Sequence, residues 1–299
     1  MRALGRLIRV REVPVLLGLV IVFVGTGLLN PIFFSVSILN DILFGVAIVA
    51  TLAIAQTFVI VMRHIDLSVG SVVGFTSFLI GDLSSKGFSL GAVLLAALLV
   101  GASVGAVNGF LVAYLGLPSL VVTLATLYIV RGIFNEVGKG QTIVESMVPE
   151  ELNWLGLNRL FGISYLFIIV LVLMVFAGFL MHRTRAARDL YAIGSNPSAA
   201  GLVGIPVKLR VLLAFTSTGA ISGLAGAVML ARFNSSSTQS GLGLELLVIA
   251  ACVVGGVSIA GGTGSVFGAV SGAVLLQTIL MAIGALGIPQ FWQLAVNGT

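Results

Sequence analysis

Long apolar runs divide the chain into segments that are each long enough to cross a lipid bilayer. A bilayer core of about 30 Å requires about 20 apolar residues in a helix. The runs are continuous, as in Leu166 to Phe179, and lack the alternation that barrel strands require. Helices are therefore predicted at residues 14–29, 38–62, 69–83, 90–115, 118–134, 165–181, 211–233, 242–260 and 266–286.

A tenth helix is expected to begin at Pro289. Because the sequence stops at Thr299, within that apolar segment, we expect the natural chain to continue. The pattern predicts an all-α, polytopic transmembrane bundle of about ten helices. We expect residues 1–299 to form a single domain of this kind, with residues 182–210 as its longest basic connection.

The composition supports a membrane environment. Apolar residues make up 59% of the 299 positions and charged residues only 8%, and the mean hydropathy is +1.20. A soluble domain normally carries about 25% charged residues because its surface must remain hydrated. This chain has too few charges to cover a globule in water, so we expect lipid to cover most of its exterior.

The placement of basic residues predicts the orientation. Basic residues concentrate in the N-terminal tail and in the 182–210 connection, whereas the 135–162 connection is acidic. Cytoplasmic connections of membrane proteins are enriched in arginine and lysine. The N-terminus and residues 182–210 are therefore predicted to be cytoplasmic. The same distribution explains the net charge of +5 without nucleic-acid binding.

The sequence contains no recognisable set of catalytic residues. Its one cysteine, Cys252, lies in an apolar run, and its two histidines, His64 and His182, are far apart. No HExxH pair, Walker A loop or GxSxG motif is present. A membrane enzyme would need convergent acids, bases or metal ligands. An ion-coupled secondary transporter, the main alternative to an importer subunit, generally needs embedded ionisable groups.

Thirty-eight glycines recur with other small residues at helical spacing. Such residues let helix backbones approach closely in lipid, and close packing is the interpretation that we favour for most of them. Val69–Gly74 resembles Thr263–Gly268, and Leu115–Pro118 resembles Leu286–Pro289. The predicted crossings place the first pair on one side of the membrane and the second pair on opposite sides. No single repeat operation fits both, so no repeat is predicted.

Polar residues within apolar segments are candidates for a solute pathway. They are Gln56, Asp66, Ser68, Asn108, Thr123 and Gln277. Each of them could line a route for a hydroxylated solute or simply form a hydrogen bond between helices. For Asp66 we favour a third interpretation, an N-cap of the helix that begins near Leu67. Glu245 could contact a binding protein or act as a first-turn acid of its helix.

The 182–210 connection carries signals for a short amphipathic helix. Asn196 is suited to the N-cap, Pro197 to the first turn and Gly204 to the end. The apolar residues Ala199, Ala200, Leu202 and Val203 would give this helix a small docking surface. An ordinary solvated loop at the lipid headgroups is the equally weighted alternative.

Four motifs resemble permease subunits of bacterial ABC importers of the ribose and autoinducer-2 class. They are Gly194-Ser-Asn-Pro-Ser-Ala-Ala200 followed by Gly204-Ile-Pro-Val207, then Ile65-Asp-Leu-Ser-Val-Gly70, Thr123-Leu-Ala-Thr-Leu127, and Ala250-Ala-Cys-Val-Val-Gly-Gly256. The resemblance follows the family's order over nearly the whole chain. It implies a type II-like importer permease, embedded in the bacterial inner membrane and paired with a second permease subunit as a homodimer or heterodimer.

The resemblance also implies partners and roles. ATP and Mg²⁺ would bind a separate cytoplasmic ATPase, a periplasmic solute-binding protein would deliver the solute, and this chain itself would hold no cofactor. Residues 194–205 would form a coupling helix that docks on the ATPase, through Gly194, Ser195, Asn196, Pro197, Ala199, Ala200, Gly204 and Ile205. Arg63-His64 before Ile65-Asp66 favours autoinducer-2 as the solute, with rhamnose, ribose or another monosaccharide next.

Overall fold

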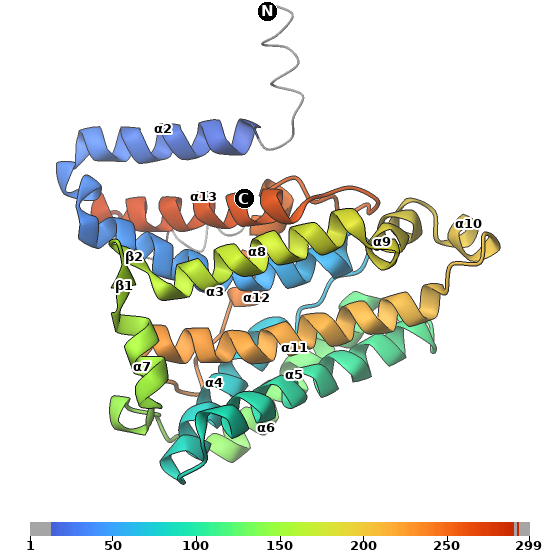
Figure 1. Ribbon diagram of the computed structural model, residues 1–299, viewed down its shortest axis with the longest axis horizontal. Coiled ribbons are helices and arrows are strands. Elements are labelled where there is room, and N and C mark those ends of the chain that lie inside the picture. Colours follow the sequence, from blue (N-terminus) through green and yellow to red (C-terminus); the bar gives the residue numbers. More distant parts are fainter. Residues whose placement is uncertain (1–12, 290–291, 293–299) are drawn as a thin grey trace, which may run out of the picture.

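The computed structural model describes residues 13–289 and residue 292, and its helices lie largely side by side along one axis (Figure 1). The basic tail with Arg2, Arg6, Arg9 and Arg11 and the tenth helix expected from Pro289 lie outside the described residues. The helices are α2 (Val13–Leu29), α3 (Val36–Ile60), α4 (Val69–Ser85), α5 (Leu90–Ala113), α6 (Ser119–Gly138), α7 (Glu150–Leu157), α8 (Tyr165–Arg183), α9 (Arg185–Ser195), α10 (Pro197–Leu202), α11 (Val207–Phe233), α12 (Leu244–Val254) and α13 (Val266–Ala285).

Among the described residues, six helices are long and apolar enough to span a membrane. They are α3, α5, α6, α8, α11 and α13, and the shorter apolar helices are α2, α4 and α12. Two short 3-10 helices, η1 (Pro31–Phe34) and η2 (Glu145–Met147), and a hairpin of β1 (Arg159–Leu160) and β2 (Ile163–Ser164) complete the structure. The predicted all-α transmembrane bundle is confirmed.

The two ends of the bundle differ in charge, as the sequence predicts. α9 and α10 lie at one end, here called the α10 end, together with the C-terminus of α3 and the N-terminus of α11 (Figure 1). α7 and the β-hairpin lie at the opposite end, here called the α7 end. The basic 182–210 connection and the acidic 135–162 connection therefore lie at opposite ends of the bundle.

The connection 182–210 is more helical than the sequence suggests. It contains both α9 and α10, and α11 begins at Val207 rather than at residue 211. Thr184 caps α9 through its hydroxyl, which accepts a hydrogen bond from the amide of Ala187 at 3.2 Å. An ion pair of 2.7 Å between Arg210 and Asp189 then joins α9 to the first turn of α11. The connection is a folded helical segment.

Two triplets of helices are related by an inverted repeat. α3, α4 and α5 correspond in order and relative length to α11, α12 and α13, since each triplet has a short helix between two long ones. α3 runs toward the α10 end and α11 runs away from it (Figure 1). α3 packs on α13 and α11 packs on α5, as a two-fold relation requires. Inverted repeats of this kind are common in transport proteins.

The repeat explains one of the two pairs of similar sequence segments. Leu115–Pro118 follows α5, and Leu286–Pro289 follows α13, at corresponding points of the two triplets. Their glycines, Gly116 and Gly287, adopt similar positive φ angles of 70° and 67°. The other pair, Val69–Gly74 and Thr263–Gly268, is not related by the repeat, because Val69 begins α4 whereas Thr263 lies in the linker before α13. The two similarities carried no conclusion from sequence alone, because only one of them marks equivalent positions of the repeat.

The middle helix of each triplet is short and follows a non-helical linker. Residues 61–68 separate α3 from α4, and residues 234–243 separate α11 from α12. The helix predicted at 242–260 ends at Val254, because Gly255 and Gly256 terminate it and Gly256 adopts a φ of 87°. With 11 residues, α12 spans about 16 Å, half of a bilayer core.

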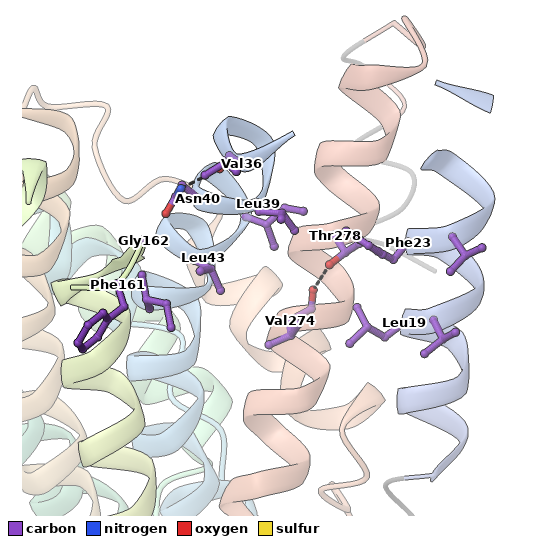
Figure 2. Close-up of a pocket in the computed structure, with 14 residues that line it drawn as sticks. Leu19, Phe23, Val36, Leu39, Asn40, Leu43, Phe161, Gly162, Val274 and Thr278 are labelled. Carbon is purple, nitrogen blue, oxygen red and sulfur yellow. Dashed lines mark hydrogen bonds between the residues drawn. The ribbon is translucent and has the colours of Figure 1, made fainter. Parts of the chain in front are cut away.

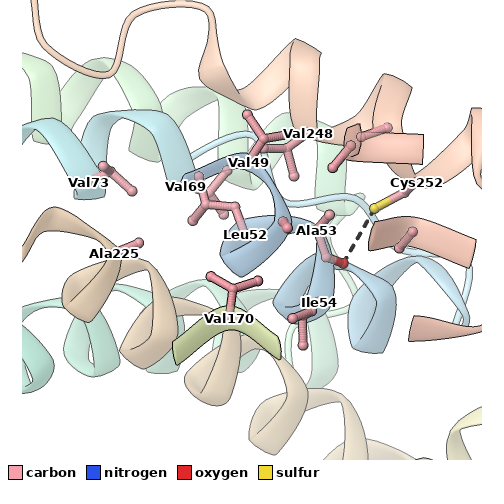
Figure 3. Packing of buried hydrophobic residues seen from close by; sticks show 14 of the residues in the cluster. Val49, Leu52, Ala53, Ile54, Val69, Val73, Val170, Ala225, Val248 and Cys252 are labelled. Carbon is pink, nitrogen blue, oxygen red and sulfur yellow. Dashed lines mark hydrogen bonds between the residues drawn. The ribbon is translucent and has the colours of Figure 1, made fainter. Parts of the chain in front are cut away.

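Helix α3 forms the centre of the bundle. Most of its side chains are buried, and Val49 and Leu52 pack among α4, α8 and α12 (Figure 3). Glycines bring the other long helices together. A Cβ atom at Gly101 or Gly105 of α5 would collide with the backbone of α11, and one at Gly219 would collide with α5. For these positions, the close-packing interpretation is confirmed.

Candidate functional site

Five of the six predicted pathway residues meet at the linker between α3 and α4. Asp66 Oδ1 accepts hydrogen bonds from the amide and hydroxyl of Ser68 at 2.9 and 2.6 Å. Asn108 on α5 donates to Ser68 Oγ at 3.0 Å, and Gln56 on α3 donates to the carbonyl of Asp66 at 3.2 Å. Thr123 on α6 donates to the carbonyl of Ile65 at 3.3 Å.

A sixth residue, Thr126, completes this set and is missed by the sequence analysis. Its hydroxyl donates to Asn108 Oδ1 at 2.6 Å. The signal was present, since Thr126 lies three residues after Thr123 and therefore near it on one face of α6. We call Gln56, Asp66, Ser68, Asn108, Thr123 and Thr126 the interior network.

The interior network is closed to solvent except at Thr126, which is half-buried. Gln56 and Asn108 are fully buried, and Asp66 retains only 1% of its exposure. Asp66 Oδ2 and Gln56 Oε1 have no hydrogen-bond partner. Unsatisfied buried polar atoms are costly in a packed interior. These two acceptors are therefore available to donors from a solute or from water if the surrounding helices separate.

The N-cap interpretation of Asp66 was wrong. α4 begins at Val69 and its N-cap is Ser68. Asp66 accepts a hydrogen bond from the amide of Ser68, which precedes the first residue of the helix. It therefore does not cap an amide of α4 itself. The hydroxyl of Ser68 donates back to Asp66, which leaves α4 without a side-chain cap. Asp66 therefore fixes the linker rather than the first turn of the helix.

Gln277 does not join the interior network. It lies on α13, and its side chain fills the space above Gly45 of α3, where a Cβ atom would collide with it. Gly45 lies 11 positions before Gln56 on α3, which corresponds to about 16 Å along the helix. The structure thus separates this candidate from the other five.

A second polar cluster lies at the N-terminus of α12. Glu245 occupies the first turn of α12 and lies against Gly70 in the first turn of α4. Arg131 on α6 donates to the carbonyls of Thr238 and Ser240 at 2.9 and 2.8 Å. We call Arg131, Glu245 and the two carbonyls the α12 mouth. Its two charged side chains are half-buried.

The α12 mouth lies farther from the α10 end than the interior network does. Glu245 is separated from the α10 end by nearly the whole length of α12, whereas Asn108 lies only five residues before the end of α5. Ionisable groups within membrane helices usually face a protein interior or a water-filled route. The first-turn interpretation of Glu245 is confirmed. Arg131 belongs with Gly132 to the segment whose sequence resembles the permease family, but the sequence suggested no role for it.

The predicted caps of the coupling helix are confirmed, but the helix is shorter than expected. Asn196 Oδ1 accepts from the amide of Ala199 at 3.1 Å, and Pro197 occupies the first position. At the other end, Gly204 adopts a φ of 87°, and the amide of Ile205 donates to the carbonyl of Ala200 at 3.1 Å. This is the pattern of a Schellman motif.

Residues 194–205 therefore do not form one helix. Gly194 and Ser195 are the last residues of α9, and Asn196, with a φ of −156°, separates them from α10. The exposed apolar side chains at the tip of α10 are Leu202, at 89% exposure, and Val203, at 77%. Ala200 is buried against the protein at 4% and cannot contact a partner.

The pocket in Figure 2 has a different character. It has a volume of about 610 Å³ and lies between α2, α3, α13 and the hairpin. Its lining is apolar except for Asn40 and Thr278, which donate to carbonyls of their own helices, Val36 and Val274. A hydroxylated solute would find few partners here, whereas lipid acyl chains would be well accommodated.

The structure combines an inverted repeat with a short middle helix in each half and with polar groups at the start of each short helix. These features together are typical of membrane transport proteins. The sequence model of the family described as branched-chain amino acid transport system / permease component matches residues 38–299. The chain belongs to this family of transport permeases. The resemblance indicated by the four motifs is thereby confirmed.

Curated relatives cover almost the whole chain. It is 37% identical over 288 residues to the autoinducer 2 import system permease protein LsrC of Escherichia coli O9:H4 (strain HS), covering 96% of this chain and 84% of the relative. The proteins of the same name from Shigella flexneri and Salmonella choleraesuis (strain SC-B67) are also 37% identical over 96% of this chain, and 84% and 82% of their lengths are covered. No solved structure matches the chain.

Proposed function

We propose that this chain is the permease subunit of an ABC importer for autoinducer-2 or a similar small monosaccharide. The observation that carries the proposal is the 37% identity, over 96% of the chain, to permeases of autoinducer 2 import systems. The subunit would lie in a bacterial inner membrane with its N-terminus and α10 end in the cytoplasm. Enrichment of basic residues at the α10 end supports this orientation.

The chain acts with three partners in this proposal. A cytoplasmic ATPase binds ATP and Mg²⁺ and supplies the energy, a second permease subunit completes the pathway, and a periplasmic binding protein delivers the solute. The assignment of ATP to a partner follows from the sequence, which contains no Walker A loop. The permease holds no cofactor of its own in this account.

Helix α10 is the docking element for the ATPase. Leu202 and Val203 project from its tip, and the folded caps on both sides fix the helix in one conformation. Exposed apolar side chains outside the membrane usually mark a contact with another protein. A cleft in the ATPase that closes on ATP binding would move α10 and the attached α9 together.

The solute pathway passes the α12 mouth and is closed below it by the interior network. Hydroxyl groups of a sugar both donate and accept hydrogen bonds, so they can bind the carboxylate of Glu245, the guanidinium of Arg131 and, after opening, the free acceptors of Asp66 and Gln56. Movement of residues 61–68 away from Asn108 would open the closed region.

Reconstitution of the permease, ATPase and binding protein into liposomes tests the proposal. We expect uptake of autoinducer-2 that requires ATP on the side of the membrane where the ATPase is bound. Competition by ribose and rhamnose then measures how specific the importer is for each solute. Solute accumulation by the purified permease alone, driven by a sodium or proton gradient, would support the ion-coupled alternative instead. Uptake assays on Gln56→Leu, with membrane insertion measured in parallel, test the assignment of the interior network to the pathway.

A further inference from the structure

The C-terminus of α9 contacts the linker before α4 and the linker after α12. Gly194 is packed between the carbonyl of Val61 and the amide of Gly262, and a Cβ atom there would collide with both. The same two groups bind each other, since the amide of Gly262 donates to the carbonyl of Val61 at 2.8 Å. Val61 begins the linker to α4, and Gly262 lies in the linker after α12. Three backbone segments therefore meet at one point.

Arg63 holds α9 to the α4 linker. Its Nε and Nη2 atoms donate to the carbonyls of Gly194 and Ser195, the latter at 2.7 Å. These are among the last carbonyls of α9, which have no partner within the helix. The guanidinium presents two parallel donors and places a positive charge at the helix C-terminus, where the dipole favours it. Asp66, three residues after Arg63, belongs to the interior network.

Tyr191 holds α9 to the other linker. Its hydroxyl donates to the carbonyl of Gly264 at 3.0 Å. Burial raises the pKa of Tyr191 above its usual value, so the hydroxyl remains a donor throughout the physiological range. α9 is thus bound to both halves of the inverted repeat, to the first by Arg63 and to the second by Tyr191 and by the ion pair between Asp189 and Arg210.

We propose that Arg63 is a positioning residue that transmits ATPase-driven movement of α9 to the 61–68 linker and thereby opens the interior network. This inference rests on the proposed function, since it requires that an ATPase moves α10 and α9. The linker has a φ of 69° at Arg63 itself, so the chain turns sharply at the point of contact. A displacement of α9 would therefore change the direction of residues 64–68 rather than stretch α3.

The complete importer in liposomes provides the test, with uptake and ATP hydrolysis measured on the same sample. Arg63→Ala is compared with Arg188→Ala, which removes an exposed arginine from the same helix that Arg63 contacts. We expect Arg63→Ala to keep the bound ATPase and its hydrolysis while uptake falls by about tenfold, the range of a typical coupling between sites. The number of ATP molecules hydrolysed per solute should rise by the same factor. Arg188→Ala should match the wild type.

Two results would overturn the inference. One is a wild-type ratio of ATP to solute in Arg63→Ala; the other is joint loss of ATPase binding, hydrolysis and uptake, which would make Arg63 an assembly residue. If Arg63→Ala does not reach the membrane, Arg63→Lys decides, because an ammonium group keeps the charge but loses the paired donors. A wild-type ratio in Arg63→Lys would then overturn the inference. Failure of the wild-type complex to require ATP would refute the proposed function itself.

Discussion

The starts of α4 and α12 occupy corresponding positions in the inverted repeat, yet they are held by different chemistry. The linker before α4 is fixed by side chains from α3, α5 and α6, all closed to solvent. The linker before α12 is fixed by Arg131 through two backbone carbonyls, with Glu245 half-exposed beside it. The linker before α4 is a buried and densely hydrogen-bonded site, whereas the linker before α12 carries two half-buried charged side chains.

This difference assigns different tasks to the two halves. A buried network that is nearly satisfied resists separation and keeps a route closed until energy is supplied. A half-exposed pair of charges can exchange water for solute hydroxyls at little cost. In the proposed function, the first half would therefore supply the closed region and the second half the region of solute contact. Substitutions in the first half should reduce stability, whereas substitutions in the second should reduce transport.

Asn108→Leu should give the largest effect. It removes the hydrogen bonds that Asn108 makes with the hydroxyls of Ser68 and Thr126, and each such bond is worth about 0.5–1.5 kcal/mol. We expect the permease to lose about 2 kcal/mol of unfolding free energy, measured by thermal unfolding in detergent. Ser103→Ala is the control, because Ser103 lies exposed on the same helix and bonds only within it. Equal stability of the two variants would mean that the interior network does not hold the linker.

Glu245→Gln should affect transport without affecting stability. The amide retains the shape of the side chain but loses the charge, and a hydrogen bond to a charged group is worth about 1.5 kcal/mol or more. Uptake by the complete importer should fall by about tenfold, while the melting temperature stays unchanged. Glu150→Gln, an exposed glutamate that is also in the first turn of its helix, α7, should leave both unchanged. A melting temperature lowered as far as that of Asn108→Leu would erase the distinction between the two halves.

Thr126→Val should give the smallest effect. It removes the hydrogen bond to Asn108 and the longer one that the same hydroxyl makes to the carbonyl of Val122 in its own helix, at nearly constant volume. The unfolding free energy should fall by about 1 kcal/mol, half of the loss in Asn108→Leu. Thr216→Val serves for comparison, since its hydroxyl bonds only to the carbonyl of Leu212 within its own helix. If Thr126→Val were indistinguishable from Thr216→Val, Thr126 would not belong to the network.

The sequence predicts local features of this protein well. The N-cap at Asn196 and the end of α10 at Gly204 depend on side chains and φ preferences within a few residues, so they can be recognised without tertiary information. The long helices follow from hydropathy for the same reason. The break at Gly255 carries a local signal too, but the apolar residues around it suggest a continuous span.

Contacts between distant residues were beyond prediction. Arg131 binds carbonyls more than a hundred residues away, and Arg63 does the same at the end of α9. Backbone carbonyls have no sequence signature, so neither contact could be anticipated. Five of the six candidate pathway residues do meet, because polar groups in apolar helices need partners and tend to find one another. Gln277 shows the limit of that rule, since its surroundings are set by Gly45 of another helix.

The most direct test of the account is whether an ATPase that docks on α10 drives this permease. Leu202→Asp places a charge at the exposed tip, and Leu202→Met keeps the tip apolar as its control. We predict that wild type and Leu202→Met co-purify with the ATPase and take up solute when ATP is supplied, and that Leu202→Asp inserts into the membrane but does neither. Retention of the ATPase and of ATP-dependent uptake in Leu202→Asp would contradict the account.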